Sequence, residues 1–148
     1  MVKTIRDNII TRTGLVLGAS FSKISFTGDL SANKFGKSSK RFGVVPDNAS
    51  ETAGVLGANT LDHKFIMVLT DGYNAGAATQ VSDDLKMEKI VELQDKALEI
   101  YKSLQANKSS ISASVLIINN LNINAVEFLE EEKVAVIRFE LTVKYKIN

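Results

Sequence analysis

The side chains best suited to chemistry are two runs of neighbouring carboxylates, Asp83–Asp84 and Glu130–Glu132. Catalytic carboxylate pairs face each other across a cleft, and one of them lies in an apolar pocket that raises its pKa. These two runs instead lie where a helix start and a turn favour negative charge. Neither run has the spacing of an EF-hand calcium loop. We therefore expect no catalytic site and no cation site in either run.

His63 is the single histidine of the chain, and there is no cysteine. A zinc site or a histidine-based triad needs more ligands or partners than this, and disulfides are excluded. His63 begins an apolar run of strand length, 63–70, so we expect a surface or capping role for it. Nucleophile elbows, phosphate-binding loops, dinucleotide fingerprints and metalloprotease helices are absent. The sequence predicts no enzyme, no metal and no cofactor, and a small enzyme is the weakest of the hypotheses.

A third group of candidates is basic and aromatic, and its members are Lys34, Phe35, Lys37, Lys40, Arg41 and Phe42. One interpretation is an arm that binds nucleic acid or an acidic partner. The other is a solvated loop that its two aromatic residues anchor. Four cations without a recognisable nucleic-acid fold favour the second interpretation.

Charge is distributed unevenly along the chain. Residues 1–48 hold eight Lys or Arg against three acids, a balance of +5, whereas 49–148 hold ten against fourteen, a balance of −4. Such segregation suits head-to-tail assembly or docking on an acidic partner.

The elements that must position these residues are clearest in the second half of the chain. Apolar residues at helical spacing and acids at the start predict a long helix over 83–106. Apolar runs at 115–118 and 121–128 lead to a terminal strand, 137–147, in which apolar and polar residues alternate. Val134 and Val136 break the polar side of that alternation, so we expect the strand's start to be covered on both faces. A helix followed by a β-hairpin is predicted.

The first half of the chain is less regular. Isoleucines at helical spacing predict a short N-terminal helix over 2–13 that ends at Gly14. Residues 21–27 favour a strand, and 28–62 lose all periodicity, which predicts a long flexible loop region. At 148 residues the chain is expected to be one domain. The predicted fold class is α+β, with a mixed, largely antiparallel sheet packed on the long central helix and the N-terminal helix. No apolar run is long enough to span a membrane, and a cytosolic, soluble protein is expected.

The order of these elements resembles that of the tail terminator, or tail-completion, proteins of long-tailed bacteriophages. The resemblance is carried by HKFIMVLTDGY (63–73), the acid-capped helix 83–106, VLIINN (115–120) and the terminal VAVIRFELTVKYKI (134–147). Such proteins end on an alternating strand, to which Leu141, Val143 and Tyr145 correspond here. They also have a strand pair before the central helix, and the region 28–62 departs from that pattern.

The resemblance implies a hexameric ring of identical subunits on the head-proximal end of a tail tube, assembled in the host cytoplasm. Its partners would be itself, the tail tube protein and a head–tail connector or neck protein, with DNA passing through the lumen without sequence specificity. Alternatives are another neck ring protein and a small nucleic-acid-binding module that uses 34–42. The residues expected to meet a neighbour, the lumen or DNA are Lys34, Lys37, Lys40, Arg41, Arg138, Glu140, Thr142, Lys144 and Lys146.

Overall fold

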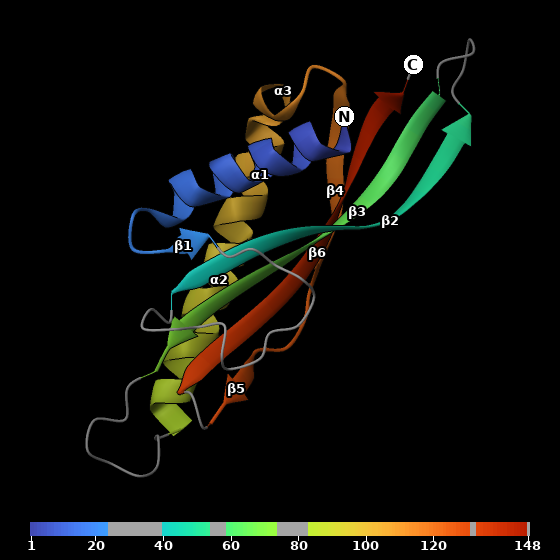
Figure 1. Ribbon diagram of the computed structural model, residues 1–148. Helices are drawn as coiled ribbons and strands as arrows, with labels where there is room; N and C mark the ends of the chain where they lie inside the picture. Colours follow the sequence, from blue (N-terminus) through green and yellow to red (C-terminus); the bar gives the residue numbers. More distant parts are fainter. Residues whose placement is uncertain (24–39, 54–58, 74–82, 131–132, 148) are drawn as a thin grey trace.

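The computed structural model describes residues 1–23, 40–53, 59–73, 83–130 and 133–147. Within them the helices and strands follow the order α1 (Val2–Leu17), β1 (Ser22–Lys23), β2 (Arg41–Ala53), β3 (Asn59–Gly72), α2 (Asp83–Ala106), α3 (Lys108–Ile111), β4 (Val115–Ile123), β5 (Glu127–Leu129) and β6 (Val134–Ile147). The described helices pack on one face of one twisted sheet (Figure 1). The predicted α+β class is confirmed.

The sheet has the strand order β1-β2-β3-β6-β4, and β5 pairs with β6 beside β4. Only the two-residue β1 is parallel to its neighbour, while all other pairings are antiparallel. The centre of the sheet is the pair β3 and β6, which stay in register from Asn59 opposite Ile147 to Gly72 opposite Val134. The last strand of the chain is therefore a central strand of the sheet.

The long helix α2 has the bounds that its sequence predicts. Asp83 and Asp84 lie in its first turn, where negative charge is favourable at the positive end of the helix dipole. A single stripe of completely buried residues packs it onto the sheet: Leu93, Ala97, Ile100 and Leu104. This spacing puts all four on one side of the helix, so burial of that side fixes how α2 lies on the sheet.

The N-terminal helix α1 runs further than its sequence predicts. Gly14 lies inside the helix, and the expected end there is wrong. The helix ends instead at Gly18, whose φ of 86° suits glycine and whose N–H donates to the carbonyl of Gly14. Gly14 is close to the ring of Phe42, so a small residue there lets α1 lie on β2.

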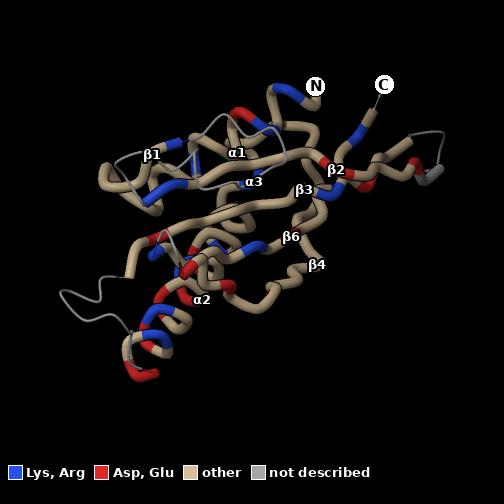
Figure 2. The backbone as a smooth tube through the Cα atoms, turned by 60° about the horizontal axis from the view of Figure 1, so that its bottom comes forward, with Lys and Arg blue, Asp and Glu red and all other residues tan. Residues whose placement is uncertain are grey.

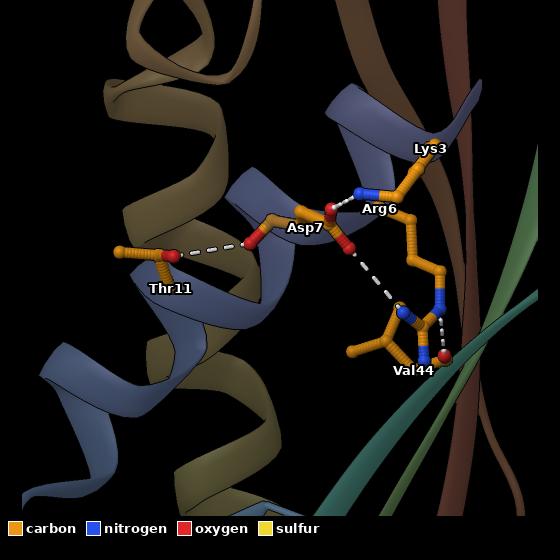
Figure 3. A network of polar contacts seen from close by, with 5 residues as sticks. All are labelled: Lys3, Arg6, Asp7, Thr11 and Val44. Carbon is orange, nitrogen blue, oxygen red and sulfur yellow. Dashed lines mark hydrogen bonds and ion pairs between the residues drawn. The ribbon is translucent and has the colours of Figure 1, made fainter. Parts of the chain in front are cut away.

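Polar contacts also fasten α1 to β2 (Figure 3). Arg6 Nε donates to the carbonyl oxygen of Val44 at 3.0 Å, and Asp7 accepts from both Arg6 and Lys3. The hydroxyl of Thr11 donates to the Asp7 carbonyl. The guanidinium of Arg6 thus links a helix to a strand whose position in the chain is 38 residues away.

The terminal strand β6 follows the predicted alternation. Phe139, Leu141 and Val143 are buried on the helix-covered face, and the residues between them are partly exposed on the opposite face. Val134 and Val136 are buried as well, in a small apolar cluster with Val68. The expectation that the strand's start is covered on both faces is confirmed.

The flexible loop predicted for 28–62 is wrong over 41–53 and 59–62, which form strands. β2 has an irregularity between Pro46 and Ala49, and its residues from Asp47 to Glu51 are exposed. A strand whose outer half is not covered on either side shows no alternation in its sequence, which is why periodicity does not reveal it. Of the strand expected over 21–27, Ser22 and Lys23 are described and 24–27 lie outside the described residues. None of the described helices has the length and apolarity to cross a bilayer.

Candidate assembly surface

The face of the sheet opposite the helices carries a group of four cross-strand charges, which we call the charge ladder: Asp62, Lys64, Glu140 and Lys144. Lys64 Nζ lies 3.7 Å from Glu140 Oε1, and Lys144 Nζ lies 3.6 Å from Asp62 Oδ1. All four side chains are about one third exposed. Each cation thus faces an anion on the neighbouring central strand, and the ladder carries no net charge.

The charge ladder continues into a polar hollow of about 480 Å³ that spans four strands. Besides Asp62, Lys64 and Lys144, its walls are uncharged polar residues: Asn48, Ser50, Asn119, Asn120 and Thr142. Asn122 Nδ2 also donates to Glu140 Oε1 at 3.3 Å. Groups of this kind bind water, other amides or a second protein surface. They offer no paired carboxylates in an apolar pocket and no nucleophile next to a base.

Toward the β5 end, the same face becomes apolar. Val68, Val134 and Val136 are buried there, with Ile66 and Leu129 packed against them. Arg138 lies opposite Val68 between the apolar and the charged parts. Its Nε is buried and has no hydrogen-bond partner among the described residues. A buried donor without a partner costs free energy, so a hydrogen bond from Arg138 to a group of another molecule would be favourable.

The residues singled out from the sequence do not form one site. Glu140 and Lys144 belong to the charge ladder, and Thr142 and Arg138 share its face. Lys146 is exposed at the end of β6. At the opposite end of the sheet, Lys40 and Arg41 lie at the start of β2, where Lys40 Nζ is 5.6 Å from the centroid of the Phe21 ring. Lys34 and Lys37 lie outside the described residues.

Lys40 lines a second polar cleft, which lies between α2 and the end of β3 and has a volume of about 600 Å³. Its walls combine three lysines with four acids: Lys40, Lys89, Lys96, Asp71, Glu92, Asp95 and Glu99. An excess of acids around Lys40 is unfavourable for binding phosphate. The described end of the basic segment 34–42 therefore does not form a positive patch.

An ion pair at the base of this cleft joins α2 to β3. Lys89 Nζ lies 3.1 Å from Asp71 Oδ2 and 2.9 Å from Glu92 Oε2, and the Asp71 side chain is only 6% exposed. Burial lowers the pKa of Lys89, but its hydrogen bonds to Glu92 and Asp71 outweigh burial and raise that pKa above its ordinary value. Lys89 is therefore held as an ammonium at neutral pH and fixes α2 against the sheet.

His63 is buried, and its expected surface or capping role is wrong. Its Nδ1 lies 3.1 Å from the Tyr145 hydroxyl, and its ring packs 4.7 Å from that of Phe65. Burial lowers the pKa of His63, although the backbone and the charge of nearby Asp47 act in the opposite direction. A neutral imidazole in a hydrogen bond with a tyrosine is a core contact, and among the described residues no group of acids and histidine is placed to hold a metal.

The outermost long strands of the sheet, β2 and β4, are partly tied to the helices. The carbonyl of Val44 in β2 accepts from Arg6, and the carbonyls of Leu116 and Ile118 in β4 accept from Lys108 and Gln105. Beyond Pro46, β2 runs on to Ala53 with β3 as its single neighbour strand in the described residues. Both strands are thus held by the helical layer, and beyond Pro46 no strand of the described residues pairs with the outer edge of β2.

Sequence reasoning does not identify four of the charged residues of these two sites: Asp62, Lys64, Asp71 and Lys89. A signal for two of them exists, because Asp62 and Lys64 alternate with His63 and Phe65, as the polar residues of 137–147 alternate with apolar ones. The antiparallel pairing of β3 with β6 then puts both alternations on the same face. The contact between Asp71 and Lys89 depends on how α2 lies on the sheet, which no local pattern encodes.

Comparison with known proteins identifies a solved structure with a similar fold. Neither the protein-family models nor the curated proteins contain a match. Among solved structures, the chain is similar to one chain of the virion of a native gene transfer agent (GTA) particle. The likeness has a TM-score of 0.54 at 9% sequence identity, and it covers 96% of this chain and 94% of that chain. At this identity the likeness shows a shared fold over nearly the whole length of both chains.

Proposed function

We propose that this protein is a structural component of a phage-like virion, and specifically a tail terminator that forms a ring on the head-proximal end of a tail tube. The observation that carries the proposal is the end-to-end fold likeness to a chain of a gene transfer agent virion. The match covers nearly all residues of both chains. This supports two subunits of the same kind rather than one domain that occurs in otherwise different proteins.

The sheet supports head-to-tail assembly of identical copies. In the order β2-β3-β6-β4 each strand is antiparallel to the next, so β2 and β4, the outermost long strands, also run in opposite directions. The two-residue β1 lies outside the start of β2. When the β2 side of one copy meets the β4 side of the next, the alternation of strand directions continues. Such an interface joins two different surfaces and closes into a ring when the rotation between copies permits. In this arrangement the part of β2 beyond Pro46, which has β3 as its single neighbour strand among the described residues, gains a second neighbour strand.

The charge ladder suits a ring lumen through which DNA passes. Lysines that faced phosphate unpaired would bind the backbone and release counterions, which holds DNA in place. Here Lys64 and Lys144 are each compensated by an acid, so the face neither holds nor repels a phosphate chain strongly. The other partners in this proposal are the tail tube protein and a neck protein, the location is the virion tail, and no catalytic step is involved. Another ring protein of the neck is the alternative within the same class.

The proposal is tested by following polymerisation of the tail tube protein from the same virion by light scattering. A terminator ring added in amounts far below the tube protein should stop elongation, because one ring blocks one growing end. Tubes that reach the same final length at every concentration of added protein would contradict the proposal. Bovine serum albumin at the same concentrations controls for crowding.

A further inference from the structure

A second apolar stripe lies on α2, away from the stripe that packs on the sheet. It consists of Met87, Val91 and Leu98, whose side chains are 59%, 49% and 40% exposed. At about 100° per residue the three fall within about 40° of one another and about 130° from the buried stripe. Single exposed aliphatic residues are ordinary, but three aligned on one helix mark an interaction face. We call them the outer stripe.

A hollow of about 590 Å³ lies at the N-terminal end of the outer stripe. Met87 and Val91 form its apolar part, and Asp84, Glu88 and Glu92 form its acidic part. It is more apolar than the two polar hollows described above. The hollow is open, and every described residue that lines it belongs to α2. A side chain of leucine or phenylalanine size lying on it would be partly removed from water against two aliphatic groups, which is favourable.

Two of the three acids around this hollow, Asp84 and Glu88, are not balanced by the lysines of the same helix. Lys86 extends to Glu130 at 2.9 Å, and Lys89 lies between the buried Asp71 and Glu92. Among the described residues, Asp84 and Glu88 form no ion pair. The helix thus directs its nearby cations toward the sheet and presents acids outward, and Figure 2 shows the acidic start of α2 at a distance from the basic positions of α1.

We infer that the outer stripe is a docking site for a basic amphipathic helix of a partner protein. The apolar stripe matches the i, i+4 spacing with which a partner helix presents its own apolar residues. The unbalanced acids call for Lys or Arg beside those residues and reject nucleic acids and anionic membranes, which carry like charge. Helix α1 of a second copy would bind the outer stripe poorly, because Leu15 is its single strongly exposed aliphatic residue beyond the terminal Met1. This inference is independent of ring formation and of the proposed terminator role.

The probe is a fluorescein-labelled helical peptide of about 18 residues, or five turns, with leucines on one face and lysines on the other. Fluorescence anisotropy measures its affinity for the full-length protein. A peptide with the same leucines and with glutamates in place of lysines is the charge control. We expect the lysine peptide to bind and the glutamate peptide to fail.

Three variants locate the binding. Val91→Lys keeps a good helix former at an exposed position and should weaken the lysine peptide by at least about tenfold. Leu15→Lys makes the same kind of change on α1 and should leave the affinity unchanged. Asp84→Asn with Glu88→Gln should weaken binding and reduce its dependence on salt.

Equal affinity of wild type and Val91→Lys, or binding of both peptides, overturns the inference. Sedimentation in which wild type self-associates and Val91→Lys does not overturns it as well, because the occupant is then a second copy.

Discussion

At the scale of single residues, the protonation of His63 is expected to make the stability of the fold depend on pH. Its burial against Phe65 and Tyr145 lowers its pKa in the folded state below the ordinary value of about 6.5. Between the two pKa values the unfolded chain binds more protons than the folded one. Stability is therefore complete above about pH 6.5 and is lost as the pH falls below it.

We expect the free energy of unfolding, measured by urea denaturation, to fall between pH 7 and pH 5. Each unit by which folding lowers the pKa of His63 corresponds to about 1.4 kcal/mol. His63→Phe keeps an aromatic ring beside Phe65 and should remove most of this pH dependence. The acids with lowered pKa, Asp7 and Glu130, titrate below this window and do not interfere. An unchanged slope in His63→Phe would assign the effect to other groups.

The ion pair of Asp71 and Lys89 gives a second prediction at this scale. Lys89→Met leaves the buried Asp71 carboxylate without its cation and should destabilise the protein by about 3 kcal/mol. Asp71→Asn leaves Lys89 with Glu92 as a partner, so its cost should be smaller, about 1–2 kcal/mol. The double variant should cost less than the sum of the two. Additive costs in thermal or urea unfolding would show that the two side chains act independently.

At the scale of elements, the open face and the core respond to different substitutions. The ion pairs of the charge ladder are partly exposed, so each contributes at most about 1 kcal/mol to stability. Glu140→Gln with Lys144→Gln should therefore leave thermal unfolding nearly unchanged. It should impair ring assembly, because Glu140 accepts a hydrogen bond from Asn122 of β4, the strand that meets the next copy in the proposed ring. Lys3→Gln removes an exposed ion pair from α1 and keeps the contact of Asp7 with Arg6, so it serves as the control. A lowered melting temperature with assembly intact would contradict this division between folding and assembly.

The elements that sequence predicts best are those with one buried side. α2 was predicted with its observed bounds, since its buried residues recur at helical spacing. The alternation of β6 likewise follows from one face packing on the helices. β2 was missed because Pro46 and the exposed residues after it remove the alternation on which a strand prediction rests. The short α3 follows α2 directly after Asn107 and carries no pattern of its own.

The candidate surface was partly predictable for the same reason. Glu140 and Lys144 stand out as polar positions in an alternating strand, so their face could be inferred. Their partners could not be inferred, because Asp62 and Lys64 reach them through the pairing of β3 with β6 across nearly 80 residues of chain. His63 shows the same limit, since its contact with Tyr145 spans 82 residues. Contacts between distant segments arise from topology, and a local pattern does not encode them.

At the scale of the whole molecule, charge is distributed asymmetrically along the chain. Residues 1–48 hold a basic excess and the remainder an acidic excess, which suits head-to-tail contacts between copies. The sheet ends in two strands that run in opposite directions, and one of its faces carries compensated charges. In the proposed ring this face would line a neutral polar lumen, and the outer stripe of α2 would be left for another partner.

The proposed terminator role is tested by electron microscopy of negatively stained tail tubes mixed with this protein. We expect a ring of added density at one end of each tube and none at the other, with the rings lost in the Glu140→Gln and Lys144→Gln double variant. Uncapped tubes in the presence of excess folded protein, or density distributed along the tube walls, would contradict it.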